Sequence, residues 1–132
     1  MSDEVVELRM PLKAGYVAVL RATTGVIAGE MSFNYDEVMQ LRVAVSEVFD
    51  IAIGIVAQRN GASEDGELVA RFVAGSDQLE ILITAPVDYT SYLHTQEGYE
   101  SLGLLESLAD KVEFEAFDSD KTLVRLAKRR VV

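Results

Sequence analysis

The chain has 132 residues, of which 49% are hydrophobic and 26% are charged, and it has no cysteine and a formal net charge of −10. This length suits a single domain over residues 1–132, and the composition excludes a disordered chain, a disulfide framework and a thiolate metal site. Because binding to DNA or RNA needs a basic surface that displaces counterions from phosphates, the charge argues against nucleic acid and favours a basic protein partner.

The first part of the chain predicts a strand followed by a helix. Apolar and charged side chains alternate over residues 5–12, as in a half-buried strand. Residues 14–28 have the periodicity of an amphipathic helix. One face of that helix would carry Tyr16, Val19, Leu20, Thr23, Val26 and Ile27.

A second, longer helix is predicted over residues 35–58. Asn34 precedes it as a capping residue, and Glu37 stands three residues later, as a capping box requires. Apolar side chains then recur at spacings of three and four residues, and Asn60-Gly61 follows as a stop signal. This is the clearest helix signal in the chain.

The second part of the chain predicts two hairpins separated by a mobile loop over residues 86–98 and a short helix over residues 99–110. The paired strands are residues 67–74 with 78–85, and residues 111–117 with 122–128. The strand over residues 78–85 has the composition of a central strand that is buried on both faces.

The order of these elements predicts the fold class. Strand, helix, helix, two strands, loop, helix and two strands give an α+β chain with two hairpins. We expect a two-layer α/β sandwich, with helices on one face of a mostly antiparallel, mixed sheet.

Two segments carry a resemblance to a known family. Residues 41–52 (LRVAVSEVFDIA) resemble the N-box helix of anti-sigma factor serine kinases, which reads approximately V-A-V-S-E-A-x-x-N-A. Residues 104–113 (LLESLADKVE) are similar to the closing segment of that family, I-x-E-x-L-x-D-x-V-x. The order of elements matches over essentially the whole chain. The resemblance implies the Bergerat (GHKL) ATPase/kinase fold, and the sequence looks closest to actinobacterial-type relatives with degenerate ATP motifs.

In the kinases of this family, a helix Glu acts as base, a helix Asn holds Mg²⁺, an Asp binds adenine and glycines admit the phosphates. Glu47 matches the base. Ile51 stands at the Asn position, and Ala85 stands where the family has the Asp of D-x-G. Without gaps, Tyr99 and Ser101 align with the glycines. The resemblance therefore implies a vestigial catalytic Glu47 in an eroded nucleotide site.

Four other residues are candidates to replace the missing nucleotide ligands. Asp50 adjoins Ile51, but it points about 100° away around the helix. Asp88 follows the strand that ends near Ala85, whereas Gly98 and Gly103 would be displaced glycines. We expect no bound cofactor and no metal site, with ATP and Mg²⁺ as cofactors only if these replacements serve.

The resemblance also implies protein partners. Anti-sigma factors of the family contact a sigma factor through an Arg on the first helix and a Glu on the last, and Arg21 and Glu106 match these positions. The implied partners are a sigma factor, an anti-anti-sigma protein of the STAS type, or both, with a homodimer as the assembly. His94, the only histidine, has no cysteine or second histidine with which to form a structural metal site.

Three functions follow from these observations. The first is an anti-sigma-factor-like binding protein that does not need nucleotide. The second is an active serine kinase that phosphorylates an anti-anti-sigma protein, and the third is a scaffold for an unrelated protein.

The first residues lack the basic start and apolar run of a secretory signal, and no apolar stretch reaches the roughly 18 residues of a membrane helix. We therefore expect a cytoplasmic protein.

Overall fold

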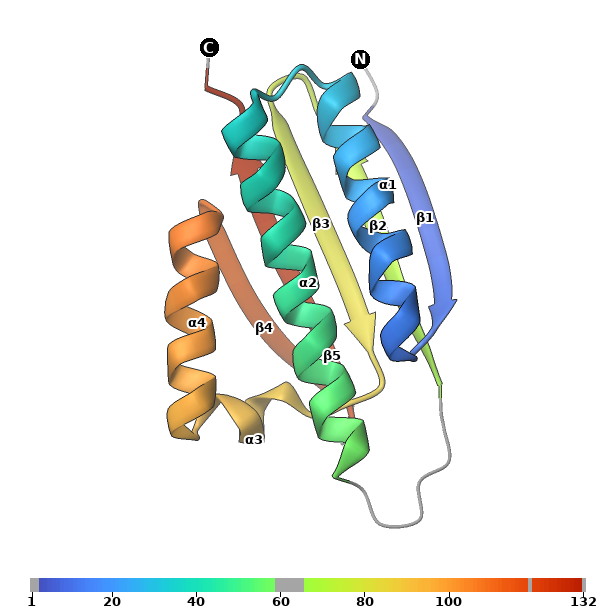
Figure 1. Cartoon of the computed structure of the whole chain (residues 1–132), viewed down its shortest axis with the longest axis vertical. Coiled ribbons are helices and arrows are strands. Elements are labelled where there is room, and N and C mark those ends of the chain that lie inside the picture. The colour runs from blue at the N-terminus through green and yellow to red at the C-terminus, as the bar shows by residue number, and fades with distance from the viewer. Residues whose placement is uncertain (1–2, 59–65, 119, 132) are drawn as a thin grey trace.

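One antiparallel sheet forms the back layer of the molecule (Figure 1). The computed structural model describes residues 3–58, 66–118 and 120–131. Its strands are β1 Glu4–Pro11, β2 Glu67–Ala74, β3 Gln78–Ala85, β4 Lys111–Asp118 and β5 Lys121–Arg129. They lie in the order β1-β2-β3-β5-β4, and each neighbouring pair is antiparallel. The predicted α+β fold class is thus confirmed.

The helices form the front layer. They are the 3-10 turn η1 Ala14–Tyr16, followed by α1 Val17–Glu30, α2 Tyr35–Ala57, α3 Tyr89–Leu93 and α4 Gln96–Leu108. Figure 1 shows α2 between α1 and α4, all three crossing the same face of the sheet, with α3 beside the lower end of α4. No described helix is long and apolar enough to cross a membrane.

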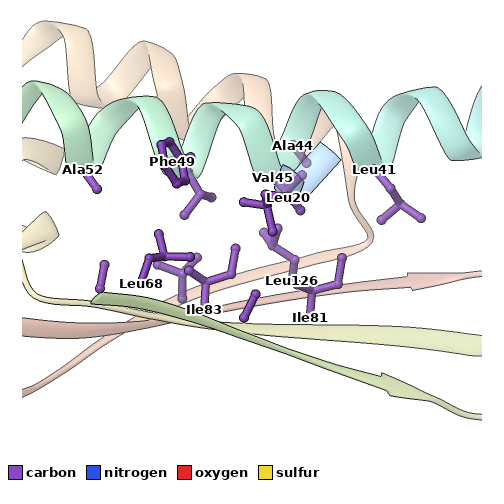
Figure 2. Packing of buried hydrophobic residues seen from close by; sticks show 14 of the residues in the cluster. Leu20, Leu41, Ala44, Val45, Phe49, Ala52, Leu68, Ile81, Ile83 and Leu126 are labelled. Atoms are coloured by element: carbon purple, nitrogen blue, oxygen red, sulfur yellow. The ribbon is translucent and has the colours of Figure 1, made fainter. Parts of the chain in front are cut away.

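The core lies between α2 and the sheet. Figure 2 shows side chains of α2 pointing at apolar side chains of the strands. Fully buried residues include Leu41, Val45 and Phe49 from α2 and Leu68, Ile81, Ile83 and Leu126 from the sheet. Each such side chain contributes roughly 1.5–3 kcal/mol through removal of its surface from water. This burial explains the regular spacing of apolar residues in α2.

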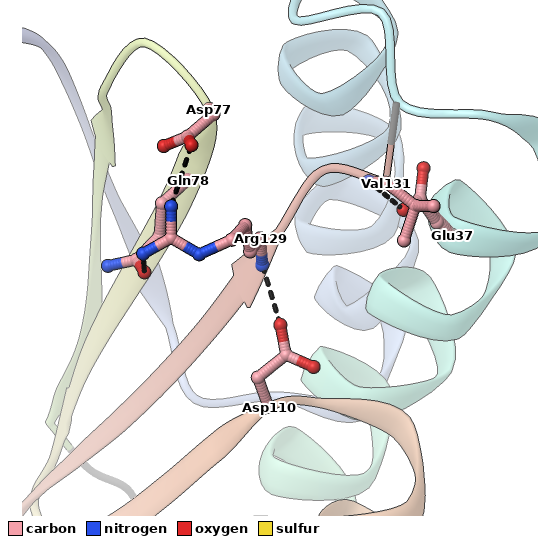
Figure 3. A network of polar contacts seen from close by, with 6 residues as sticks. All are labelled: Glu37, Asp77, Gln78, Asp110, Arg129 and Val131. Carbon is pink, nitrogen blue, oxygen red and sulfur yellow. Dashed lines mark hydrogen bonds and ion pairs between the residues drawn. The ribbon is translucent and has the colours of Figure 1, made fainter.

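The capping box predicted at the start of α2 is present, and it has a second role. Asn34 accepts a hydrogen bond from the backbone N–H of Glu37, and one carboxylate oxygen of Glu37 accepts from the N–H of Asn34, both at 2.8 Å. The other oxygen of this buried carboxylate accepts from the N–H of Val131 at 2.8 Å (Figure 3). Glu37 therefore ties the residues after β5 to the first turn of α2.

Carboxylates also hold the end of β5. The N–H of Arg129 donates to Asp110 at 2.7 Å, and its guanidinium donates to Asp77 at 2.6 Å (Figure 3). Arg130 donates to the carbonyl oxygen of Met31 at 2.7 Å. These contacts join the ends of three strands and the α1–α2 connection at one end of the molecule.

The predicted face of α1 is wrong in part. The buried side chains are Leu20, Thr24 and Ala28, which recur every four residues, whereas Val26 is 66% exposed. The Thr24 hydroxyl donates to the carbonyl oxygen of Leu20 at 2.8 Å, so this polar side chain is tolerated in the core. The larger apolar side chains of Val19 and Val26 remain exposed.

The prediction that β3 is buried on both faces is also wrong. Its residues alternate between buried and half-buried, because the helices cover only one face of the sheet. On the other face Arg125 of β5 bridges Glu80 of β3 at 3.1 Å and Glu113 of β4 at 3.3 Å. Leu82, which makes the run look continuously apolar, lies on this second face and is half-buried there.

Residues 86–98, predicted as a mobile loop, contain α3 and the first turn of α4. Asp88 caps α3 by accepting from the N–H of Thr90 at 2.9 Å. Thr95 caps α4 by accepting from the N–H of Gly98 at 3.0 Å. Caps rather than apolar periodicity mark where these helices begin, which is why the hydrophobic pattern missed α3 and the first residues of α4. The stop signal at Asn60-Gly61 lies outside the described residues.

Candidate functional site

Two adjoining cavities separate the second half of α2 from α3 and the start of α4. The first, of about 230 Å³, is lined by Glu47, Asp50, Ile51, Gly54, Ile55, Gln58, Tyr92 and Glu97. The second, of about 330 Å³, is lined by Glu47, Tyr92, Glu97, Glu100, Ser101 and Leu104. Since the two share three residues, we treat them as one feature, the α2–α4 groove.

Glu47, the candidate base, lies in this groove and is hydrogen-bonded. Its carboxylate accepts from the hydroxyl of Ser101 at 2.7 Å, and the Tyr92 hydroxyl lies 3.2 Å from the same Ser101 oxygen. Ser101 is only 8% exposed. One short polar chain thus connects α2, α3 and α4, and Glu47 already holds a serine hydroxyl from its own protein.

Asp50 lies in the same groove, one helical turn from Glu47. Asp50 was expected to point away from Ile51 around the helix. It nevertheless belongs to the site, because both residues line the first cavity. Partial burial raises the pKa of Asp50, the nearby Glu47 carboxylate raises it further, and Arg21 lowers it. Within the described part of the chain, no group of three or more acidic or histidine side chains is arranged to hold a metal ion.

The positions aligned with the magnesium ligand and the adenine ligand are both in the core. Ile51 is 6% exposed and Ala85 is fully buried. Beyond Ala85 the chain buries Val87 and Tyr89 completely. Tyr89 donates its hydroxyl to the carbonyl oxygen of Val48 at 2.7 Å, and burial raises the pKa of this phenol. Side chains of the protein itself therefore occupy the space beyond the end of β3.

Asp88 is placed at the start of α3 rather than in the groove. Besides the Thr90 N–H, its carboxylate accepts from the hydroxyl of Thr90 and, at 2.9 Å, from that of Ser91. These hydrogen bonds to the charged form lower the pKa of Asp88. The residue acts as a helix cap in this conformation.

The two candidate glycines differ in what surrounds them. A Cβ on Gly98 would stand 2.7 Å from the Cα of Leu93 and closer still to the carbonyl oxygen of Tyr92, so α4 meets α3 where only glycine fits. Gly103 is exposed and has open space around it. Tyr99 and Ser101, aligned with the family glycines, lie inside α4, where backbone N–H groups are used within the helix.

The candidate partner residues lie on two different helices. The Arg21 guanidinium on α1 donates to the Ser46 hydroxyl on α2 at 3.5 Å, and its side chain is half-buried. Glu106 is exposed on α4, on the other side of α2 (Figure 1). His94 is exposed and ends α3.

None of Gln58, Glu97 and Glu100 was assigned to the site from the sequence, although all three line the groove. Glu97 and Glu100 stand with Ser101 and Leu104 on one side of α4, at spacings of three and four. The capping signal of Thr95 would have revealed that side, because it starts the helix early enough to include Glu97.

Comparison with protein-family profiles found no match. Comparison with individual proteins was decisive. The chain is 30% identical over 129 residues to the serine-protein kinase RsbW of Bacillus pumilus, an alignment that covers 86% of this chain and 79% of that protein. The chain belongs to the RsbW family.

A second relative agrees with this assignment, and a solved structure shares the fold. RsbW of Bacillus subtilis is 27% identical over 125 residues, covering 83% of this RsbW-family chain and 76% of that protein. The crystal structure of the RsbU and RsbW domains of Rv1364c from Mycobacterium tuberculosis matches with a TM-score of 0.72 at 13% identity. That match covers 96% of this chain and 32% of the longer one, and it shows a shared fold.

Proposed function

We propose that this RsbW-family chain is an anti-sigma-factor-like regulator that binds a sigma factor, an anti-anti-sigma protein or both without using nucleotide. The observation that carries the proposal is the burial of Ile51 and Ala85 in the core. At these two positions the family resemblance requires a magnesium ligand and an adenine ligand. The side chains of isoleucine and alanine have no oxygen or nitrogen atom with which to coordinate magnesium or to hydrogen-bond adenine.

The rest of the groove supports the same proposal. A nucleoside triphosphate is a polyanion, and the charged side chains among the described lining residues are all carboxylates. The segment aligned with the phosphate-binding glycines is helical, so its amides are not free to receive phosphate oxygens.

The residues matched to partner contacts lie outside the groove, so binding to a protein partner does not require nucleotide. Arg21 and Glu106 flank α2 on α1 and α4, and both match positions through which the family contacts its partners. An Arg at an interface pairs well with a carboxylate because of its planar fork. We therefore assign partner contact to these two residues.

The test is calorimetric titration of the purified protein with ATP and with ADP, each with Mg²⁺. We expect no binding heat at high micromolar protein, together with co-purification of a sigma factor or an anti-anti-sigma protein. Binding of nucleotide at micromolar concentration would refute the nucleotide-independent function. Failure to capture either partner at high protein concentration would favour the scaffold for an unrelated protein.

A second candidate, the active serine kinase, is favoured by one observation. The Glu47 carboxylate accepts a hydrogen bond from the Ser101 hydroxyl at 2.7 Å, as a base for a substrate serine would. Transfer of phosphate from ATP to an anti-anti-sigma protein would establish this function. Loss of the transfer in a Glu47→Gln variant would assign it to the groove.

A further inference from the structure

The α2–α4 groove has a charge that suits a ligand opposite to ATP. Glu47 and Asp50 face it from α2, and Glu97 and Glu100 face it from α4. The cation that acts on Asp50 is Arg21, which approaches from α1 and donates to Ser46. Among the described residues that line the groove, nothing basic offsets these four carboxylates.

The groove also has apolar and open surfaces that a long side chain can use. Ile51 and Ile55 line it from α2, with the ring of Tyr92 from α3. Gly54 lies between the two isoleucines, exposed and with no neighbouring atom near the place where a Cβ would stand. The stem of a lysine or arginine packs along such apolar walls while its charged end reaches carboxylates, and a guanidinium also stacks on an aromatic ring.

We propose that the α2–α4 groove docks a basic segment of a protein partner, with an arginine or lysine side chain entering beside Tyr92 among Glu47, Asp50, Glu97 and Glu100. The two cavities, of about 230 and 330 Å³, hold a side chain with its neighbouring residue. The net charge of −10 attracts a basic segment before contact. The inference rests on the proposed function in one respect: the groove must not be occupied by nucleotide.

The charge of the two α2 carboxylates supports this assignment. Glu47 and Asp50 repel one another, and this repulsion together with partial burial raises the pKa of Asp50. A cation placed between them relieves the repulsion, so docking stabilises the groove as well as the complex. An anionic ligand would increase the same repulsion.

The experiment is an NMR titration of the ¹⁵N-labelled chain with the pentapeptide acetyl-Ala-Leu-Arg-Leu-Ala-amide at low salt. We expect the backbone amides of Tyr92, Glu97 and Ser101 to shift and saturate. A twin peptide with neutral citrulline in place of arginine should bind at least tenfold more weakly. Equal binding of both peptides, or no shift with either, overturns the proposal.

Two pairs of variants locate the binding. Asp50→Asn with Glu97→Gln should weaken the arginine peptide at least tenfold, whereas Glu115→Gln, on the exposed side of β4, should leave it unchanged. Gly54→Leu should block the groove without changing charge, whereas Gly29→Leu, also exposed and without close neighbours, should not. Equal effects within either pair would place the peptide elsewhere.

The nucleotide titration separates this inference from the proposed function. If ATP does not bind and the peptide does not bind, the inference alone fails. If ATP with Mg²⁺ binds and displaces the arginine peptide, the groove still docks a cation but the nucleotide-independent function fails. If ATP binds and the peptide does not, both fail.

Discussion

The phenol oxygen of Tyr89 lies 2.7 Å from the carbonyl oxygen of Val48 and donates a hydrogen bond to it across the core. Tyr89 is fully buried and its ring centroid is 5.4 Å from that of Phe114. We expect Tyr89→Phe to lower the free energy of unfolding by about 1 kcal/mol, because one buried hydrogen bond is lost while the ring stays. Urea denaturation measures this. Tyr99→Phe, at a residue that is 73% exposed, is the control and should change nothing.

Ser32 has a φ of 65°, in the left-handed region, just after α1. The N–H of the next residue, Phe33, donates back to the carbonyl oxygen of Ala28 at 3.1 Å, as in a Schellman motif that usually places glycine here. We expect Ser32→Gly to raise the free energy of unfolding by a few tenths to about 1 kcal/mol, the relief of strain being partly offset by the freer unfolded chain. Ser76→Gly in the exposed β2–β3 turn, where φ is negative, should stabilise nothing.

The contact of α3 with α4 depends on Gly98. We expect Gly98→Ala to destabilise the protein by about 1–3 kcal/mol, because its methyl group would meet the backbone at Tyr92 and Leu93. Gly103→Ala on the same helix has open space and should be stabilising by up to about 1 kcal/mol, as usual for an exposed helix interior. Denaturant titration of the two variants tests this, and equal effects would contradict the tight contact.

The pKa of Asp50 is raised above its ordinary value of 3.8, so the folded protein binds its proton more tightly than the unfolded chain does. The associated stability is present below that value and is lost as pH rises through the folded pKa. We expect Asp50→Asn to raise the melting temperature relative to the parent near pH 7, with the difference vanishing near about pH 3. A destabilised variant near pH 7 would mean that the attraction to Arg21 outweighs burial and the repulsion from Glu47.

Arg21 and Glu106 are expected to matter for partner capture and not for folding. Arg21→Ala and Glu106→Ala should each weaken capture of a sigma factor or an anti-anti-sigma protein by about tenfold or more, as central charged contacts do. Melting temperatures should stay close to that of the parent, because Arg21 makes one long hydrogen bond and Glu106 is exposed. Glu115→Ala is the matched control. Unchanged capture in both variants would remove these residues from the interface.

Much of the fold was predictable from local signals. The bounds of β2 and β3 agree with the prediction at every end, because Gly75 closes the hairpin by donating to the carbonyl oxygen of Gln78 at 2.9 Å. The start of α2 agrees because the capping box is encoded within four residues. The buried face of α1 was not predictable in the same way. Thr24 is buried and Val26 is exposed, an outcome that depends on which face of α1 the tertiary packing turns inward and that periodicity alone did not fix.

The site was predictable only where it lies on α2. The N-box alignment brought out Glu47, and Asp50 lies beside it in the groove. The opposite wall comes from α3 and the start of α4. Both lay in the predicted loop over residues 86–98, so Glu97 was placed outside any helix, and Glu100, inside the predicted helix, was given no role. That wall is positioned by a close backbone contact at Gly98, and such contacts leave no trace in hydrophobic pattern.

The bond from Val131 to Glu37 joins residues 94 positions apart in the sequence. The hairpins β2–β3 and β4–β5 join segments that are neighbours in the sequence, whereas this bond requires β5 to be docked beside β3 and α2 to have its first turn in place. It therefore closes after most of the chain has been organised. Protection of the Val131 amide from hydrogen exchange would report completion of folding, and its early loss would report the first opening of the native state.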